Sequence, residues 1–82
     1  MNWEDAKKAC EALGNGWRLS TKDESKTLYL NKDKISGFVS NNYWSSTESG
    51  SNDAWVQYLG NGFQYYTNKI NQFNVRAVRT IK

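Results

Sequence analysis

Residues 45–48 read Ser-Ser-Thr-Glu, the stretch of this chain that most suggests nucleophilic catalysis. A serine nucleophile needs a neighbouring base to accept its proton, and that base is usually a histidine. The chain contains no histidine, so a histidine-dependent triad is excluded. A lysine-assisted serine is a minor alternative, although no spacing pairs a lysine with either serine. We predict that the protein is not an enzyme and that Glu48 accepts backbone hydrogen bonds that fix the following loop.

Metal and disulfide chemistry has few residues to draw on. Cys10 is the only cysteine, so it cannot form a disulfide within the chain, and without histidine or further thiols there is no zinc cluster. Its spacing places Cys10 on the apolar side of a helix, where it is interpreted as a small buried residue. We therefore predict no metal site and no cofactor.

Aromatic and amide side chains crowd residues 57–74. Consecutive side chains of a strand point to opposite faces, so Tyr65 and Tyr66 cannot both be buried in one core. Tyrosine offers a rigid ring and a hydroxyl, and asparagine a donor and an acceptor, the combination that antibody binding loops use. We predict a ligand-binding face here, in preference to ordinary surface aromatics. Its predicted residues are Tyr58, Phe63, Tyr65, Tyr66, Asn68, Ile70, Asn71 and Phe73.

Two helices are expected in the first half of the chain. Asn2 is a suitable N-cap for the first helix, which should end at Gly14 because glycine accepts a left-handed backbone. Thr21 and Glu24 have the spacing of a capping box, and residues 24–31 are predicted to form a second helix. The apolar face of the first helix is expected to comprise Trp3, Ala6, Cys10 and Leu13.

The second half has the pattern of a small sheet. Residues 43–47, 54–59 and 63–67 are predicted strands, and Gly-Asn-Gly at 60–62 is a strong hairpin signal. A last strand is predicted at residues 75–81. The order of elements predicts an α+β class, and the length of 82 residues predicts one domain covering residues 1–82. All four tryptophans, Trp3, Trp17, Trp44 and Trp55, are interpreted as core or anchor residues.

Several motifs resemble one bacterial family. They are Asn2-Trp3-Glu4-Asp5-Ala6, Gly16-Trp17-Arg18-Leu19, Tyr43-Trp44-Ser45-Ser46-Thr47-Glu48, Ala54-Trp55 and Val75-Arg76-Ala77-Val78-Arg79. Together they resemble the Lcl C-terminal domain family, found in collagen-like adhesins and other bacterial surface proteins. The resemblance covers nearly the whole chain. It implies a C-type-lectin-like fold, with two helices packed on a twisted antiparallel sheet, which the variable proteins of diversity-generating retroelements share.

This chain departs from the family pattern in ways that affect its fold and its chemistry. Ser20 stands where such domains usually carry proline, so the entry to the second helix is expected to be less rigid. The strand expected ahead of the first helix is absent from the sequence, so either that strand has been truncated or the final strand pairs differently. An exposed sheet edge would then invite another chain. C-type lectins hold calcium and sugar with a Glu-Pro-Asn or Gln-Pro-Asp motif. The chain has no proline, and we predict no calcium-dependent sugar site.

The resemblance implies a recognition or adhesion module located outside the cell, at a cell surface or on a phage virion. Its expected partner is a protein or glycan receptor on another cell, with no nucleic acid and no membrane insertion. The parent protein is expected to assemble as a homo-oligomer, namely a trimer, as such adhesins commonly do. In retroelement-diversified domains, the variable positions carry residue types such as Tyr, Phe, Ile and Asn. Residues 57–74 are rich in the same types, so this segment is a candidate variable region.

Two other functions compete with this one. Lys69, Arg76, Arg79 and Lys82 give the C-terminal third a basic character, and adhesins of the resembling family are associated with sulfated glycosaminoglycans. The net charge of +3 is nevertheless ordinary for a soluble domain. The other alternative is a structural oligomerisation module, in which the aromatic face is a subunit interface.

Overall fold

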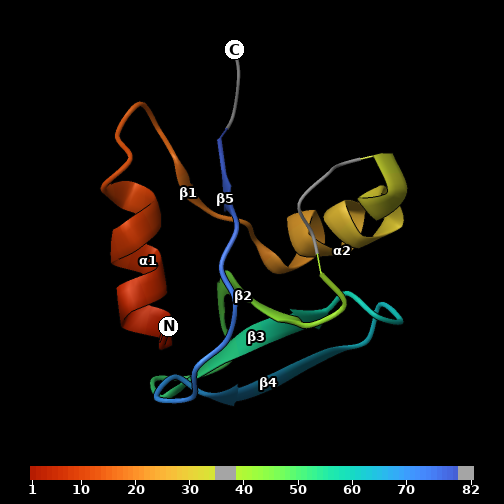
Figure 1. The fold of residues 1–82 in the computed structure, drawn as a ribbon. Coiled ribbons are helices and arrows are strands. Elements are labelled where there is room, and N and C mark those ends of the chain that lie inside the picture. The colour runs from red at the N-terminus through yellow and green to blue at the C-terminus, as the bar shows by residue number, and fades with distance from the viewer. Residues whose placement is uncertain (35–38, 80–82) are drawn as a thin grey trace.

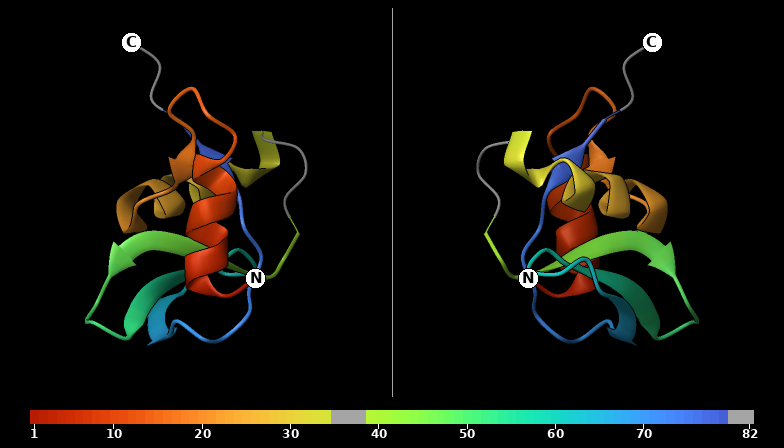
Figure 2. Two further views of the ribbon diagram at one scale, coloured as in Figure 1. Left: turned by 90° about the vertical axis from the view of Figure 1, so that its left-hand side faces the viewer. Right: turned by 90° about the vertical axis from the view of Figure 1, so that its right-hand side faces the viewer.

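The computed structural model describes residues 1–34 and 39–79, which form an α+β domain of two α-helices and a small antiparallel sheet (Figure 1). The three-stranded sheet lies at one end of the molecule, and both helices lie at the other end with a two-stranded pair between them (Figures 1 and 2). The elements are α1 (Trp3–Glu11), β1 (Arg18–Leu19), α2 (Lys22–Leu30), the 3-10 helix η1 (Lys32–Lys34), β2 (Asn42–Glu48), β3 (Asp53–Tyr58), β4 (Gln64–Asn68) and β5 (Ala77–Val78).

Helix α1 begins as the sequence predicts. The Asn2 side chain accepts a hydrogen bond from the Asp5 N–H at 2.9 Å, which satisfies one of the free donors of the first turn. The expectation for Leu13 is wrong: α1 ends at Glu11, and Leu13 is 60% exposed. Three residues with positive φ, at positions 14–16, reverse the chain there, and the turn that leads into them already includes Leu13.

Helix α2 begins with the predicted capping box. Thr21 Oγ1 accepts from the Glu24 N–H, and Glu24 Oε1 accepts from the Thr21 N–H at 2.8 Å. The helix starts at Lys22, two residues before the predicted range. Ser20, which stands where such domains usually carry proline, is buried, and its hydroxyl forms a 2.6 Å hydrogen bond with the Ser25 hydroxyl.

The Arg18–Glu24 pair makes the stability of the domain depend on pH. The Arg18 guanidinium donates two hydrogen bonds to the carboxylate of Glu24, at 2.6 and 2.8 Å. This contact is the main reason that the pKa of Glu24 is lowered to about 2. A lowered pKa stabilises the fold above the unfolded value, near 4.3, and that contribution is lost as the pH falls toward 2.

We therefore expect Glu24→Gln to be less stable at neutral pH, by about 1 kcal/mol or less because the pair is partly exposed. Urea unfolding should show a shallower loss of stability in the variant than in the wild type between about pH 4.5 and about 2. Asp23→Asn is the control, because Asp23 is a neighbouring carboxylate that forms no ion pair with any described residue. Equal pH profiles for wild type and Glu24→Gln would contradict the assignment.

The sheet β2–β3–β4 is antiparallel and matches the predicted strands closely. The Asn-Gly signal is confirmed as the β3–β4 turn, where Gly62 has φ of +83°. A Cβ at Gly62 would lie 2.5 Å from the ring of Tyr29, which packs over the turn from α2. Only glycine therefore meets both the backbone and the packing requirements at position 62.

The last strand is shorter than predicted and pairs away from the main sheet. Strand β5 covers Ala77–Val78, and residues 80–81 of the predicted strand lie outside the described residues. Its partner is β1, with Leu19 opposite Ala77. Met1 and Phe73 exchange two backbone hydrogen bonds, each of 2.9 Å, so the segment before β5 is held beside the start of α1.

The core lies between α1 and the sheet. Trp44 is only 1% exposed, and its indole N–H donates to the Met1 carbonyl, while the Trp3 indole donates to Ser45. Burial raises the pKa of the Cys10 thiol, in keeping with a packing role. The buried core residues are Trp3, Ala6, Cys10, Leu19, Trp44, Ala54 and Val56.

Among the described residues, no helix has the length and apolar character needed to cross a membrane.

Candidate functional site

The β3–β4 register divides the predicted ligand-binding residues between the two faces of the sheet. Val56 lies opposite Tyr65, and Trp55 lies opposite Tyr66, so the two tyrosines point to opposite sides. Tyr65 is half-buried against the core, and Tyr66 is exposed. The eight predicted residues therefore do not form one continuous surface.

Four of them gather on the face that carries the core. The ring of the buried Trp44 lies 4.9 Å from the Phe73 ring, measured between ring centroids. The Phe73 and Tyr65 centroids are 6.4 Å apart, and the Tyr65 and Phe63 centroids are 6.0 Å apart. The last ring is 61% exposed, so the series runs from the interior to solvent. Strand alternation adds Tyr58 to the same face. We call the surface formed by Asn42, Tyr58, Phe63, Tyr65 and Phe73 the aromatic surface.

Asn42 is the member of this surface that the sequence analysis missed. The Tyr65 hydroxyl donates a 2.8 Å hydrogen bond to Asn42 Oδ1, and this contact holds the tyrosine ring across the sheet from β4 to β2. Burial raises the pKa of Tyr65, so the hydroxyl keeps its proton for this bond. The Asn42 amide nitrogen has no partner among the described residues, which leaves a directed donor beside the rings.

A shallow hollow adjoins the aromatic surface at Phe73. Its volume is about 240 Å³, and it is open to solvent. Three amide side chains and one ring surround it, so its chemistry is that of hydrogen bonding beside an apolar contact. The hollow is lined by Met1, Asn41, Gln72, Phe73 and Asn74.

The predicted residues of the loop after β4 have a structural role. Asn68 Oδ1 accepts from the Ile70 N–H at 3.0 Å, and the Asn71 amide donates to Thr67 Oγ1 at 2.7 Å. These bonds fix the loop at the end of β4 that is remote from Phe63. Ile70 projects into solvent there, apart from the aromatic surface.

Tyr66 belongs to a different cluster on the opposite face. Its ring meets Trp55 edge-on at 5.2 Å, and the Lys22 ammonium lies 3.7 Å from the centre of the Trp55 ring. The prediction that Trp55 is a core residue is wrong. Because Trp55 is the neighbour of Ala54 in β3, alternation turns it away from the core.

Charge is nearly absent from the segment that forms most of this surface. Lys69 is the only charged residue between positions 54 and 75. Its side chain is 13% exposed, forms a 2.8 Å ion pair with Glu48 and lies over the Trp3 ring. The hydrogen bond that Lys69 donates within this ion pair is also the main cause of the lowered pKa of Glu48. Glu48 was expected to accept backbone N–H groups; its recorded partner is instead Lys69, which donates in turn to the Ser51 carbonyl.

The other basic residues have separate positions. Arg79 lies over the Trp17 ring at 5.3 Å, Arg76 lines an interior cavity, and Lys82 lies outside the described residues. Of the described residues, Arg76 and Arg79 do not form one basic patch with Lys69. No group of three histidine, cysteine, aspartate or glutamate residues that could hold a metal occurs in residues 1–34 and 39–79.

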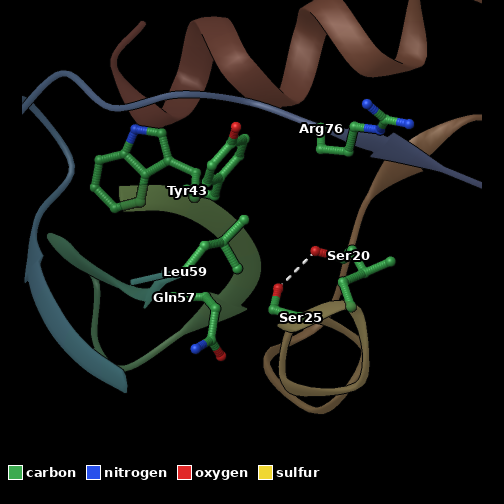
Figure 3. A pocket seen from close by; sticks show the side chains of 8 residues that line it. Ser20, Ser25, Tyr43, Gln57, Leu59 and Arg76 are labelled. Carbon is green, nitrogen blue, oxygen red and sulfur yellow. Dashed lines mark hydrogen bonds between the residues drawn. The ribbon is translucent and has the colours of Figure 1, made fainter. Parts of the chain in front are cut away.

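The interior cavity between α2 and the sheet is too small for a ligand. Its volume of about 10 Å³ has room for at most one water molecule. Figure 3 shows the hydrogen-bonded Ser20 and Ser25 hydroxyls on one side and Tyr43 and Leu59 on the other. Gln57 donates to the Tyr58 carbonyl, whereas its Oε1 atom has no hydrogen-bond partner among the described residues. A binding site must therefore be sought on the surface.

The fold and the site define a small α+β domain that presents an uncharged aromatic surface at one face of an antiparallel sheet. The sequence model of the Lcl C-terminal domain matches residues 1–79. The chain therefore belongs to the Lcl C-terminal domain family, as its Trp-Ser-Ser-Thr-Glu and Val-Arg-Ala-Val-Arg motifs indicated. No curated protein sequence matches it.

Proposed function

We propose that this domain is a non-enzymatic recognition module that binds an uncharged ligand through the aromatic surface. The observation that carries the proposal is the ring series ending at the exposed Phe63, flanked by amides, in a segment whose only charged residue is Lys69. Rings supply apolar contact area at low entropic cost, and amides supply directed hydrogen bonds. The ligand class is a neutral glycan or a protein receptor on another cell.

The proposed setting is an extracellular or cell-surface protein that displays several copies of the domain. A surface of a few rings beside a shallow hollow supports modest affinity for one copy. Several copies acting together would raise the effective affinity without new contacts. The C-type-lectin-like fold that the family resemblance implies is part of this proposal, with binding that is independent of calcium because the chain lacks the proline of the calcium loop.

The competing proposal, a sulfated glycosaminoglycan site, draws on the basic residues of the C-terminal third. Lys69 is already engaged by Glu48 and Ser51, and Arg79 lies over Trp17. A polyanion site would need these cations to leave their partners or to serve two roles. We therefore favour the uncharged ligand.

Salt dependence separates the two ligand classes. The domain, tetramerised to raise avidity, is applied to an array of neutral and sulfated glycans and to intact bacterial and animal cells. We expect retention that changes by less than about twofold between about 50 and about 500 mM salt, because no ion pair contributes. A polyanion ligand would lose about tenfold or more over the same range and would be confined to sulfated glycans. That outcome would contradict the proposal.

A further inference from the structure

Strand β4 forms an open border of the sheet. It pairs with β3 on one side, and no other described residue pairs with it along the strand. The Tyr58 N–H donates to the Phe63 carbonyl, and the Lys69 N–H donates to the Asn52 carbonyl. Hydrogen-bonded pairs alternate along an antiparallel ladder, so the backbone groups of Gln64, Tyr66 and Asn68 point away from β3. In Figure 1 this border faces away from both helices.

The strand lacks the features that usually protect such a border. Its sequence, Gln-Tyr-Tyr-Thr-Asn, contains no charge and no proline, and its register with β3 is regular over all five residues. Natural proteins commonly block exposed edges with lysine, proline, a bulge or a covering segment. An unprotected border of this kind accepts another strand readily.

The strand is also complementary to itself. An antiparallel pair centred on Tyr66 would place Tyr66 opposite its own copy, Tyr65 opposite Thr67, and Gln64 opposite Asn68. Because the outward backbone groups belong to residues 64, 66 and 68, this register joins the two Tyr66 residues by mutual hydrogen bonds. In the same register, the Asn68 N–H of each copy donates to the Gln64 carbonyl of the other copy. No like charges face each other across the pair.

We propose that a second copy of this chain adds to β4 in antiparallel orientation, with Tyr66 on the twofold axis. The two three-stranded sheets then become one continuous sheet of both copies. Each Tyr65 remains on the face that carries its aromatic surface, so both aromatic surfaces are displayed on the same side of the joined sheet. The pairing is independent of the proposed ligand, although it would supply the bivalence that a weak binding surface needs.

The test is the mass of the chain in solution across a concentration series, by sedimentation equilibrium. The wild type should approach twice its 9.5 kDa mass at high concentration. Such a small interface predicts dissociation constants of roughly micromolar to millimolar size. Tyr66→Lys should remain monomeric, because it places two like charges together on the axis. Tyr66→Phe should still associate, because the ladder does not use the hydroxyl.

Ala12→Lys is the matched control, since it adds the same charge at an exposed position beside α1, far from β4. Circular dichroism establishes that each variant is folded. Hydrogen exchange gives a readout that needs no variant: the Tyr66 amide should gain protection as the concentration rises. A monomer at all concentrations, a dimer that persists in folded Tyr66→Lys, or protection of β4 that appears only when a foreign ligand is added would each overturn the proposal.

Discussion

Replacement of Trp44 by alanine is expected to leave the domain largely unfolded at room temperature. Trp44 is the largest fully buried side chain, it packs edge-on against Phe73, and its indole N–H satisfies the Met1 carbonyl. Removal of a buried tryptophan typically costs about 3–5 kcal/mol. A single-core domain of this size has a net stability of only about 3–5 kcal/mol, so the loss is comparable to the whole.

Far-UV circular dichroism and urea unfolding measure this effect directly. Trp55→Ala is the matched control, because Trp55 is also a strand tryptophan but contacts Tyr66 and Lys22 outside the core. We expect it to cost about 1–2 kcal/mol and to keep a cooperative transition. A native-like transition in Trp44→Ala, or equal losses in the two variants, would show that the core is not centred on Trp44.

The sequence predicts the helices and the hairpin well because their signals are local. Asn2 and Thr21 cap the first turns of their own helices, and Asn-Gly accepts the backbone of its own turn. The short β1–β5 pair was not predicted. It depends on residues nearly sixty positions apart in the chain, and no local pattern reports on such a pairing.

The sequence predicted most of the residues of the candidate site, but it did not predict how they are arranged on the two faces of the sheet. Alternation showed that Tyr65 and Tyr66 must face opposite ways, but only the register with β3 decides which of them faces the core. Trp55 was misassigned for the same reason. Asn42 was missed because the predicted strand began one residue later, and its role depends on a hydroxyl two strands away.

The basic residues illustrate a further limit of composition. Lys69 contributes to the net charge, yet its ammonium group is enclosed by Glu48, the Ser51 carbonyl and the Trp3 ring. A count of lysines and arginines cannot distinguish such an internal cation from one that is open to a ligand. Only the contacts show that the charge is already partnered.

The most direct test of the recognition proposal is removal of the Phe63 ring. Phe63 is 61% exposed and stacks on Tyr65, so Phe63→Ala removes the outermost part of the aromatic surface without opening the core. We expect its effect on stability to stay within about 0.5 kcal/mol. Retention of the tetramerised domain on the cells or neutral glycans that bind the wild type should fall by about tenfold or more.

Leu13→Ala provides the matched control, because Leu13 is a 60% exposed apolar side chain in the turn after α1, far from the aromatic surface. The account predicts that Leu13→Ala binds as the wild type does, whereas Phe63→Ala, although folded, loses binding. Undiminished binding by folded Phe63→Ala, or an equal loss in both variants, would contradict it.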